Sequence, residues 1–247
     1  MPEQLWFTSI LNRVLGGPVN AILQALPPAF HPANPQAPIT NGTAMEILVV
    51  GIILLIFLLV RSRLSVDKPG GLQHLVEMLD EFVSNQSEEI IGHHSERFTP
   101  YLLSLFLLIL LANMIGLIPG FESPTSDYAM PLGLAVLTFI YYNVHGIRAQ
   151  GPIGYLKHFM GPVWWLAWLL FPIEIFSHSA RLLSLTVRLR ANIFAGDKVT
   201  GAFFNLIPLG VPVIFLMLHV AVAILQAYVF TLLATIYLQG AVAEPEH

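Results

Sequence analysis

The chain has 247 residues, of which 55% are hydrophobic and only 11% are charged, and its formal net charge is −4. Soluble domains carry about 25% charged residues, so this composition excludes an ordinary soluble domain and favours a protein whose solvent is the lipid bilayer, where lipid-facing and core-facing positions must both be apolar. The negative balance argues against a nucleic-acid partner, and the absence of cysteine excludes disulfides, thiolate metal sites and cysteine nucleophiles.

The N-terminal segment, residues 1–43, is rich in proline between positions 27 and 38. It lacks a basic region followed by a long apolar core and a small-residue cleavage site, so we expect no cleaved signal peptide. Residues 5–26 predict a short interfacial helix, and the remainder is typical of loops. We therefore expect an extracytoplasmic or interfacial segment over residues 1–43, followed by a single membrane domain over residues 44–247.

The first membrane span is expected at residues 45–61, which form an apolar run. Arg61, Arg63 and Lys68 close this run or follow it, and basic residues beside a span mark the cytoplasmic side. The N-terminus is therefore predicted to lie outside. Residues 71–92 mix apolar residues at helical spacing with acidic ones, which is typical of an amphipathic helix at the membrane surface. Because this helix is acidic, a protein partner fits it better than anionic lipid does.

Further apolar segments follow at residues 98–118, 131–147, 163–194 and 206–239. About 20 helical residues cross a hydrocarbon core of about 30 Å, so the last two segments are too long to stand upright and are expected to form a strongly tilted hairpin. The predicted fold is an all-α polytopic membrane protein with five membrane-embedded helices and one amphipathic surface helix. Its C-terminus is expected in the cytoplasm.

The fourth apolar segment carries an unusual set of polar residues. On a helical projection, Glu174, His178, Arg181, Arg188 and Asn192 fall within an arc of about 80°. An ionised side chain in mid-membrane costs from about 2.5 to more than 10 kcal/mol. Several such groups on one stripe therefore indicate a water-filled cavity, a charged partner, or both.

Arg188 is the most informative member of this stripe, because arginine does not lose its proton and stays charged wherever it lies. Arg190 falls on the opposite face, where it could face lipid and reach the interface with its head group, or pair with a neighbouring subunit. His219 and Gln226 share one face of the fifth segment, and Phe230 extends that face. For Gln226, a plain helix–helix hydrogen bond is an equally good interpretation.

Four runs of sequence carry a resemblance to a known family. They are SLTVRLRANIFAGD at 184–197, HVAVAILQAYVFTLLATIYL at 219–238, FTPYLLSLFLLILLANMIGLIPG at 98–120 and SPTSDYAMPLGLA at 123–135. Their content and order resemble subunit a of the bacterial type of F-type ATP synthase, the proton-channel subunit of the Fo sector. Three positions depart from that family's pattern: Arg190 is often apolar there, Asp197 is often glutamate, and His219 is glutamate in some members. The last two could be a compensated pair.

The resemblance implies a stator subunit that forms two offset proton half-channels against a rotating c-ring and couples proton translocation to ring rotation and ATP synthesis. Arg188 would be the essential ring-facing cation, with Asn192 and Gln226 beside it. The implied half-channel residues are Glu174, His178 and Arg181 on the inner side, and Asp197 and His219, together with Gln226, on the outer side.

The same resemblance implies the partners of the chain. These are the c-ring with its rotor carboxylates, the subunit b peripheral stalk, the remainder of the F1Fo ATP synthase, membrane lipids and the translocated H+. The implied location is a bacterial inner membrane. No metal or cofactor is expected, and the chain would be a proton-translocating component of an enzyme that does not itself catalyse bond formation.

Two other classes of function stay open from the residues. A proton-coupled secondary transporter also buries charges at mid-membrane, but it usually shows internal repeats and helices interrupted by glycine or proline. No repeat is evident in this sequence. A purely structural membrane anchor would not need a polar stripe. Co-purification with a c-ring and a soluble nucleotide-binding head would separate the three.

Overall fold

The computed structural model describes residues 4–28, 31–32, 34–66, 68–92, 95–118, 120–160, 164–206 and 211–242, which contain helices and no strand. The long helices are α1 (Trp6–Gln24), α2 (Asn41–Ser62), α3 (Gly71–Ile91), α4 (Thr99–Ile115), α5 (Ala129–Met160), α6 (Ala167–Leu206) and α7 (Val211–Val242). Short 3-10 turns are η2 (Ser95–Arg97), η3 (Pro124–Ser126) and η4 (Trp164–Leu166). The all-α fold class is therefore confirmed.

Several of these helices have the length and composition of membrane spans. Within the described residues, three qualify: Asn41–Ser62, Ala129–Pro152 and Val213–Val242, while Thr99–Ile115 is apolar but shorter. Helix α6 differs in carrying six charged residues along its 40 positions. The chain is thus a multi-pass membrane-embedded protein, and the expected count of five spans stays a prediction.

Helix α4 lies at the centre of the fold. Leu102, Ile109 and Ala112 have no exposed surface, and α4 packs against α2, α3 and α7. The facing side of α7 presents Ala227 and Ala234, which are also buried. Small residues let two helices approach closely. In lipid there is no hydrophobic driving force between helices, so such close packing contributes much of the free energy of association.

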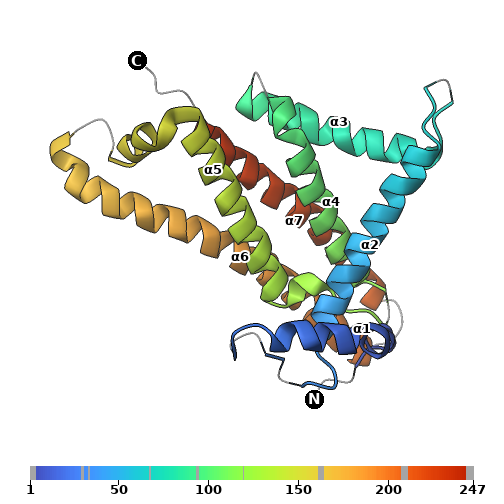
Figure 1. Ribbon diagram of the computed structural model, residues 1–247. Coiled ribbons are helices and arrows are strands. Elements are labelled where there is room, and N and C mark those ends of the chain that lie inside the picture. Colours follow the sequence, from blue (N-terminus) through green and yellow to red (C-terminus); the bar gives the residue numbers. More distant parts are fainter. Residues whose placement is uncertain are drawn as a thin grey trace.

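Helices α1 and α3 lie across opposite ends of this bundle (Figure 1). Helix α3 buries Val83 and Ser87 and leaves Leu72, Leu75 and Met78 exposed. Helix α1 is attached by the side chain of Asn12, whose Nδ2 donates to the carbonyl of Ile39 at 2.9 Å and whose Oδ1 accepts from the Ile39 amide at 3.0 Å. This side-chain pairing fixes the N-terminal segment at the start of α2.

Helix α5 is broken at Gly151, which has φ 72° and is followed by Pro152. Glycine tolerates a positive φ and proline cannot donate to the helix, so the axis changes direction here. The part before the break covers the expected segment 131–147, and the part after it turns Tyr155 back onto the first part, where its hydroxyl donates to Asn143 Oδ1 at 2.8 Å. Gly146 makes this approach possible, because a Cβ at this position would lie 2.6 Å from the Tyr155 ring and 3.0 Å from the carbonyl oxygen of Ala241 in α7.

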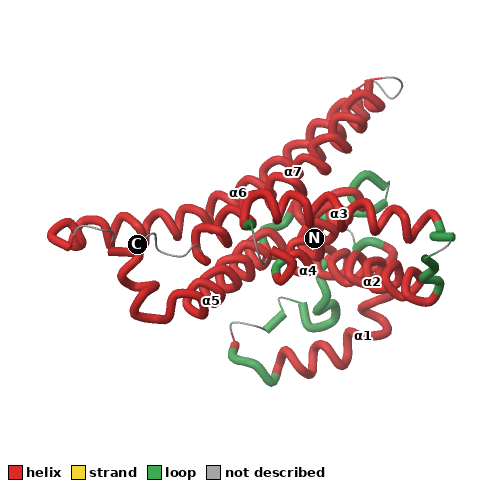
Figure 2. The backbone as a smooth tube through the Cα atoms, turned by 90° about the horizontal axis from the view of Figure 1, so that it is seen from above, coloured by secondary structure: helices red, strands yellow, loops and turns green. Residues whose placement is uncertain are grey.

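Helices α6 and α7 form a long hairpin whose tip projects beyond the other helices (Figure 2). The 40 residues of α6 span about 60 Å at 1.5 Å per residue, which exceeds the thickness of a hydrocarbon core. The helix does not end near residue 194, as expected, but continues to Leu206. Asp197 therefore lies inside α6, not at an outer turn between two helices.

The loop before α5 is bonded to α4 by buried polar groups. Thr125 Oγ1 donates to Asn113 Oδ1 at 2.6 Å, and Ser123 Oγ donates to the carbonyl of Ala112 at 2.9 Å. Asn113 Nδ2 in turn donates to the carbonyl of Ala223 in α7 at 3.4 Å. The loop consequently forms a fixed wall beside α6 and α7.

Candidate functional site

The first polar cluster lies in the first half of α6. Nε2 of His178 is 3.3 Å from Oε1 of Glu174, and Nη2 of Arg181 is 3.8 Å from the same oxygen. A cavity of about 90 Å³ adjoins all three and is also lined by Tyr155 and Tyr237. Because a liquid water molecule occupies about 30 Å³, this cavity has room for a short chain of waters.

The second cluster lies further along α6, on the side of the hairpin tip. Nε2 of His219 in α7 is 3.7 Å from Oδ1 of Asp197 in α6. His219 is only 4% exposed, and its Nε2 has no hydrogen-bond partner within the described part of the chain. Both residues line a cavity of about 390 Å³, together with Glu122 and Lys198. The structure thus brings together Asp197 and His219, two of the three residues that depart from the family pattern.

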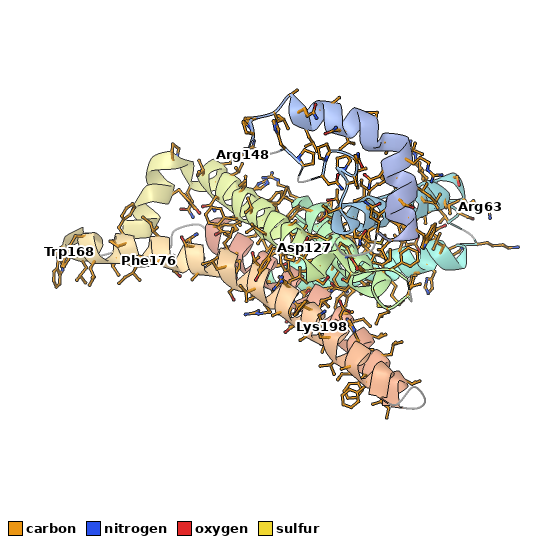
Figure 3. The ribbon with its side chains drawn as sticks, turned by 90° about the horizontal axis from the view of Figure 1, so that it is seen from below. Arg63, Asp127, Arg148, Trp168, Phe176 and Lys198 are labelled. Carbon is orange, nitrogen blue, oxygen red and sulfur yellow. The ribbon has the colours of Figure 1, made fainter. Side chains whose placement is uncertain are left out.

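These clusters are well separated along α6. Figure 3 shows Trp168 and Phe176 near one end of the helix and Lys198 well along it toward the hairpin tip. At 1.5 Å per residue, Glu174 and Asp197 are about 35 Å apart along the axis, so the two cavities lie at well-separated points along α6.

Arg188 lies between them, about 21 Å from Glu174 and about 14 Å from Asp197 along the same axis. Its Nη2 donates to Ser184 Oγ at 3.3 Å. No aspartate or glutamate of the described ranges forms an ion pair with it. The neighbouring Val187 is 55% exposed. Arg188 itself is half-buried, and Ser184 and Ala191 on the same side of α6 are exposed. Arg188 is therefore a permanent cation without a counter-charge from these residues, beside uncovered positions of α6.

Asn192 and Gln226 join the hairpin beside Arg188. Asn192 Nδ2 donates to Gln226 Oε1 at 2.9 Å. This is the helix–helix hydrogen bond that stayed open as an interpretation of Gln226. The Nε2 of Gln226 is nevertheless buried and has no hydrogen-bond partner among the residues with described positions. Such an unpaired donor is costly, which favours water beside it.

Arg190 has a structural explanation that the sequence did not provide. Its guanidinium lies 3.6 Å from the ring centroid of Tyr128 and 5.2 Å from that of Phe194. Both alternatives drawn from the sequence placed this side chain outside the fold, facing lipid or another subunit. The contacts instead place it against the loop before α5, where a cation–π interaction fixes the wall behind Arg188.

Sequence reasoning missed several residues that complete these clusters. Tyr142 contacts His178, Tyr155 lines the smaller cavity, and Glu122 lines the larger one. Both tyrosines lie in α5 among other aromatic residues, so their spacing carries no signal. Glu122 could have been suspected, because it is an acid in a short loop between two apolar segments.

Comparison with known proteins gives a consistent result. The family model described as ATP synthase A chain matches residues 43–239. A protein named ATP synthase subunit a from Koribacter versatilis is 56% identical over 245 residues, which is 98% of both chains. The protein of the same name from Solibacter usitatus is 49% identical over 86% of this chain and 91% of its own length. A protein named ATP synthase subunit a 1 from Syntrophotalea carbinolica is 42% identical over 83% of this chain and 86% of its own length. A match of this extent shows that the chain belongs to the ATP synthase subunit a family.

Proposed function

We propose that this membrane-sector subunit of ATP synthase is the stator of a rotary motor and forms two offset proton half-channels against a ring of c-subunits. The observation that carries the proposal is the position of Arg188. It is a fixed cation beside exposed positions of α6, between two polar cavities at different points along the same helix. A partner that supplies moving carboxylates to this face would explain all three features.

The chemistry follows from the charge of Arg188. A rotor carboxyl that comes beside the guanidinium is stabilised as its anion and releases its proton. Away from the guanidinium, in lipid, the anion is costly and the carboxyl must be protonated. The ring can therefore turn only when its lipid-facing carboxyls are neutral. A fixed positive charge also repels a proton that would cross directly from one cavity to the other.

Each cavity supplies one half of the path. Glu174, His178 and Arg181 are proposed to line the inner half-channel, and Asp197 and His219 the outer one, with Gln226 and Asn192 ordering water between it and Arg188. One elementary charge crossing 100 mV gains about 2.3 kcal/mol. Several protons must pass for each ATP made, so a multi-site ring suits the task better than a single carrier.

The remaining arrangement is proposed on the same basis. The c-ring would cover the Arg188 face of α6, and the subunit b stalk and the rest of F1Fo would complete the complex. The N-terminal segment 1–43 lies outside a bacterial inner membrane, the domain over 44–247 spans it, and the C-terminus is cytoplasmic. Arg61 and Arg63 at the end of α2 support this orientation, because basic residues favour the cytoplasmic side.

The experiment that tests the proposal replaces Arg188 by alanine in the whole complex. We expect ATP-driven proton pumping into inverted membrane vesicles to be lost, while ATP hydrolysis by the soluble head survives. Arg63→Ala is the matched control, since Arg63 lies far from α6 (Figure 3), and it should pump normally. Pumping at the normal rate by Arg188→Ala would refute the central role of this residue.

A further inference from the structure

Tyr142 of α5 makes a direct contact with the inner cluster. Its hydroxyl oxygen is 3.0 Å from Nδ1 of His178. Tyr142 is 2% exposed and His178 is 9% exposed, so water has little access to this bond. The phenol ring is held by Phe139 and Tyr237, whose ring centroids lie 5.4 and 6.1 Å from its own. Packing on two sides thus fixes where the hydroxyl points.

The two nitrogens of His178 face different partners. Nε2 is 3.3 Å from Oε1 of Glu174. An ionised carboxylate only accepts hydrogen bonds, so Nε2 must carry the hydrogen in that contact. In a neutral imidazole, Nδ1 is then the acceptor, and the hydrogen of the Tyr142 hydroxyl points at it. Arg181 lies 3.8 Å from the same carboxylate oxygen and already supplies its opposite charge, so a neutral imidazole leaves the cluster balanced.

We propose that Tyr142 is a positioning residue of the inner half-channel, which holds neutral His178 in the tautomer that presents its Nε2 hydrogen to Glu174 and the cavity. This inference rests on the proposed function, because it concerns a residue that lines the inner half-channel. His178 stays neutral there and donates its Nε2 hydrogen to Glu174, while protons pass by way of the Glu174 carboxylate and the cavity. The Tyr142 bond sets which nitrogen carries that hydrogen.

The charged and titratable groups around His178 come from three helices. Glu174 and Arg181 belong to α6, Tyr155 accompanies Tyr142 in α5, and Tyr237 belongs to α7. Of these, Tyr142 is bonded to the nitrogen that would accept a second proton. Loss of its donated hydrogen bond therefore removes a competitor for that proton and favours the imidazolium form.

The test is the Tyr142→Phe variant in the intact ATP synthase. The rate of proton pumping into inverted vesicles, divided by the rate of ATP hydrolysis, is measured as a function of the pH of the surrounding medium. Phenylalanine keeps the ring contacts, so the complex should assemble. The acid limb of the pumping profile should move to higher pH by about half a unit to one unit, the value of one hydrogen bond. Fluorotyrosine at position 142, a stronger donor of the same shape, should move it to lower pH.

Two further variants separate the possible causes. Tyr141→Phe removes the hydroxyl of the neighbouring tyrosine, whose ring centroid lies 3.8 Å from that of Tyr101 in a stacked contact. This variant should leave the pH profile unchanged. In a His178→Ala background, Tyr142→Phe should have no added effect on the profile. An unchanged profile in Tyr142→Phe, a shift of the opposite sign, or a shift that persists without His178 would overturn the inference. A normal profile in His178→Ala alone would instead contradict the proposed inner half-channel.

Discussion

The pair formed by Asp197 and His219 gives the sharpest test of the outer path. We expect His219→Ala to slow proton uptake, because it removes a proton-exchanging group from the larger cavity and leaves Asp197 without its partner. A compensating change at Asp197 should then restore part of the rate. The clearest form is the exchange variant that carries Asp197→His together with His219→Asp, since it rebuilds the same pair with the partners reversed.

The magnitude follows from the separation of the two side chains. At 3.7 Å, two full charges interact by about 4 kcal/mol at an effective dielectric constant of about 20. The cavity beside them admits water, which reduces this value. Double-mutant cycles of contacting residues give about 0.5 to 3 kcal/mol, which corresponds to a coupling of about 2-fold to 160-fold in rate.

The assay is proton uptake driven by an imposed pH difference and membrane potential, in liposomes that contain the complete complex. Wild type, Asp197→Asn, His219→Gln and the double variant form the cycle, and His219→Ala and the exchange variant are measured beside them. ATP hydrolysis by the detached soluble head checks that each preparation is intact. Single losses that simply multiply in the double variant would refute the pairing, and an exchange variant as slow as His219→Ala would do the same.

Two predictions concern packing. Gly146→Ala should destabilise the packing of α5 on itself and on α7 by about 1 to 3 kcal/mol, because its Cβ would lie 2.6 Å from the Tyr155 ring of α5 and 3.0 Å from the Ala241 carbonyl oxygen of α7. Thermal release of the subunit from the purified complex should occur at a lower temperature than in Gly133→Ala, where the new methyl meets nothing within 4 Å. Equal melting of the two variants would show that the close approach does not matter. Tyr128→Leu should lower the stability of the fold by about 1 to 2 kcal/mol, because it removes the ring that contacts Arg190, and the loss is measured as a lower melting temperature. In an Arg190→Leu background, Tyr128→Leu should cause no further loss of stability. Additive losses in the double variant would exclude this contact as the cause.

The fold class could be predicted because the bilayer imposes its requirements on composition. A spanning segment must be apolar over about 20 residues and helical throughout, so hydropathy alone shows where spans such as Asn41–Ser62 lie. The residues at which helices end were harder to predict. Leu206 ends α6 well beyond the expected limit. Residues 195–206 include Gly196, Asp197, Lys198 and Gly201, so hydropathy alone did not mark them as a continuation of the helix.

The candidate site divides in the same way. Glu174, His178 and Arg181 recur at helical spacing within one segment, and the structure places them together. Partners from other helices could not be found by that route. Tyr142 and Tyr128 are ordinary aromatic residues in the sequence, and their contacts with His178 and Arg190 depend on how α5 and the loop before it pack on α6.

The sequence by itself determined that this protein is embedded in a membrane and has an all-α polytopic fold. It also determined that one helix carries a permanent cation within a stripe of polar groups. Those features are local, because hydropathy, helical period and the charge of arginine need no knowledge of the neighbours. Only the tertiary structure decided which cavity each polar group lines, that Asp197 lies beside His219, and that Arg190 is held by Tyr128. Contacts between helices depend on their relative rotation and depth, which small residues such as Gly146 and buried hydrogen bonds such as that of Asn113 fix from positions far apart in the chain.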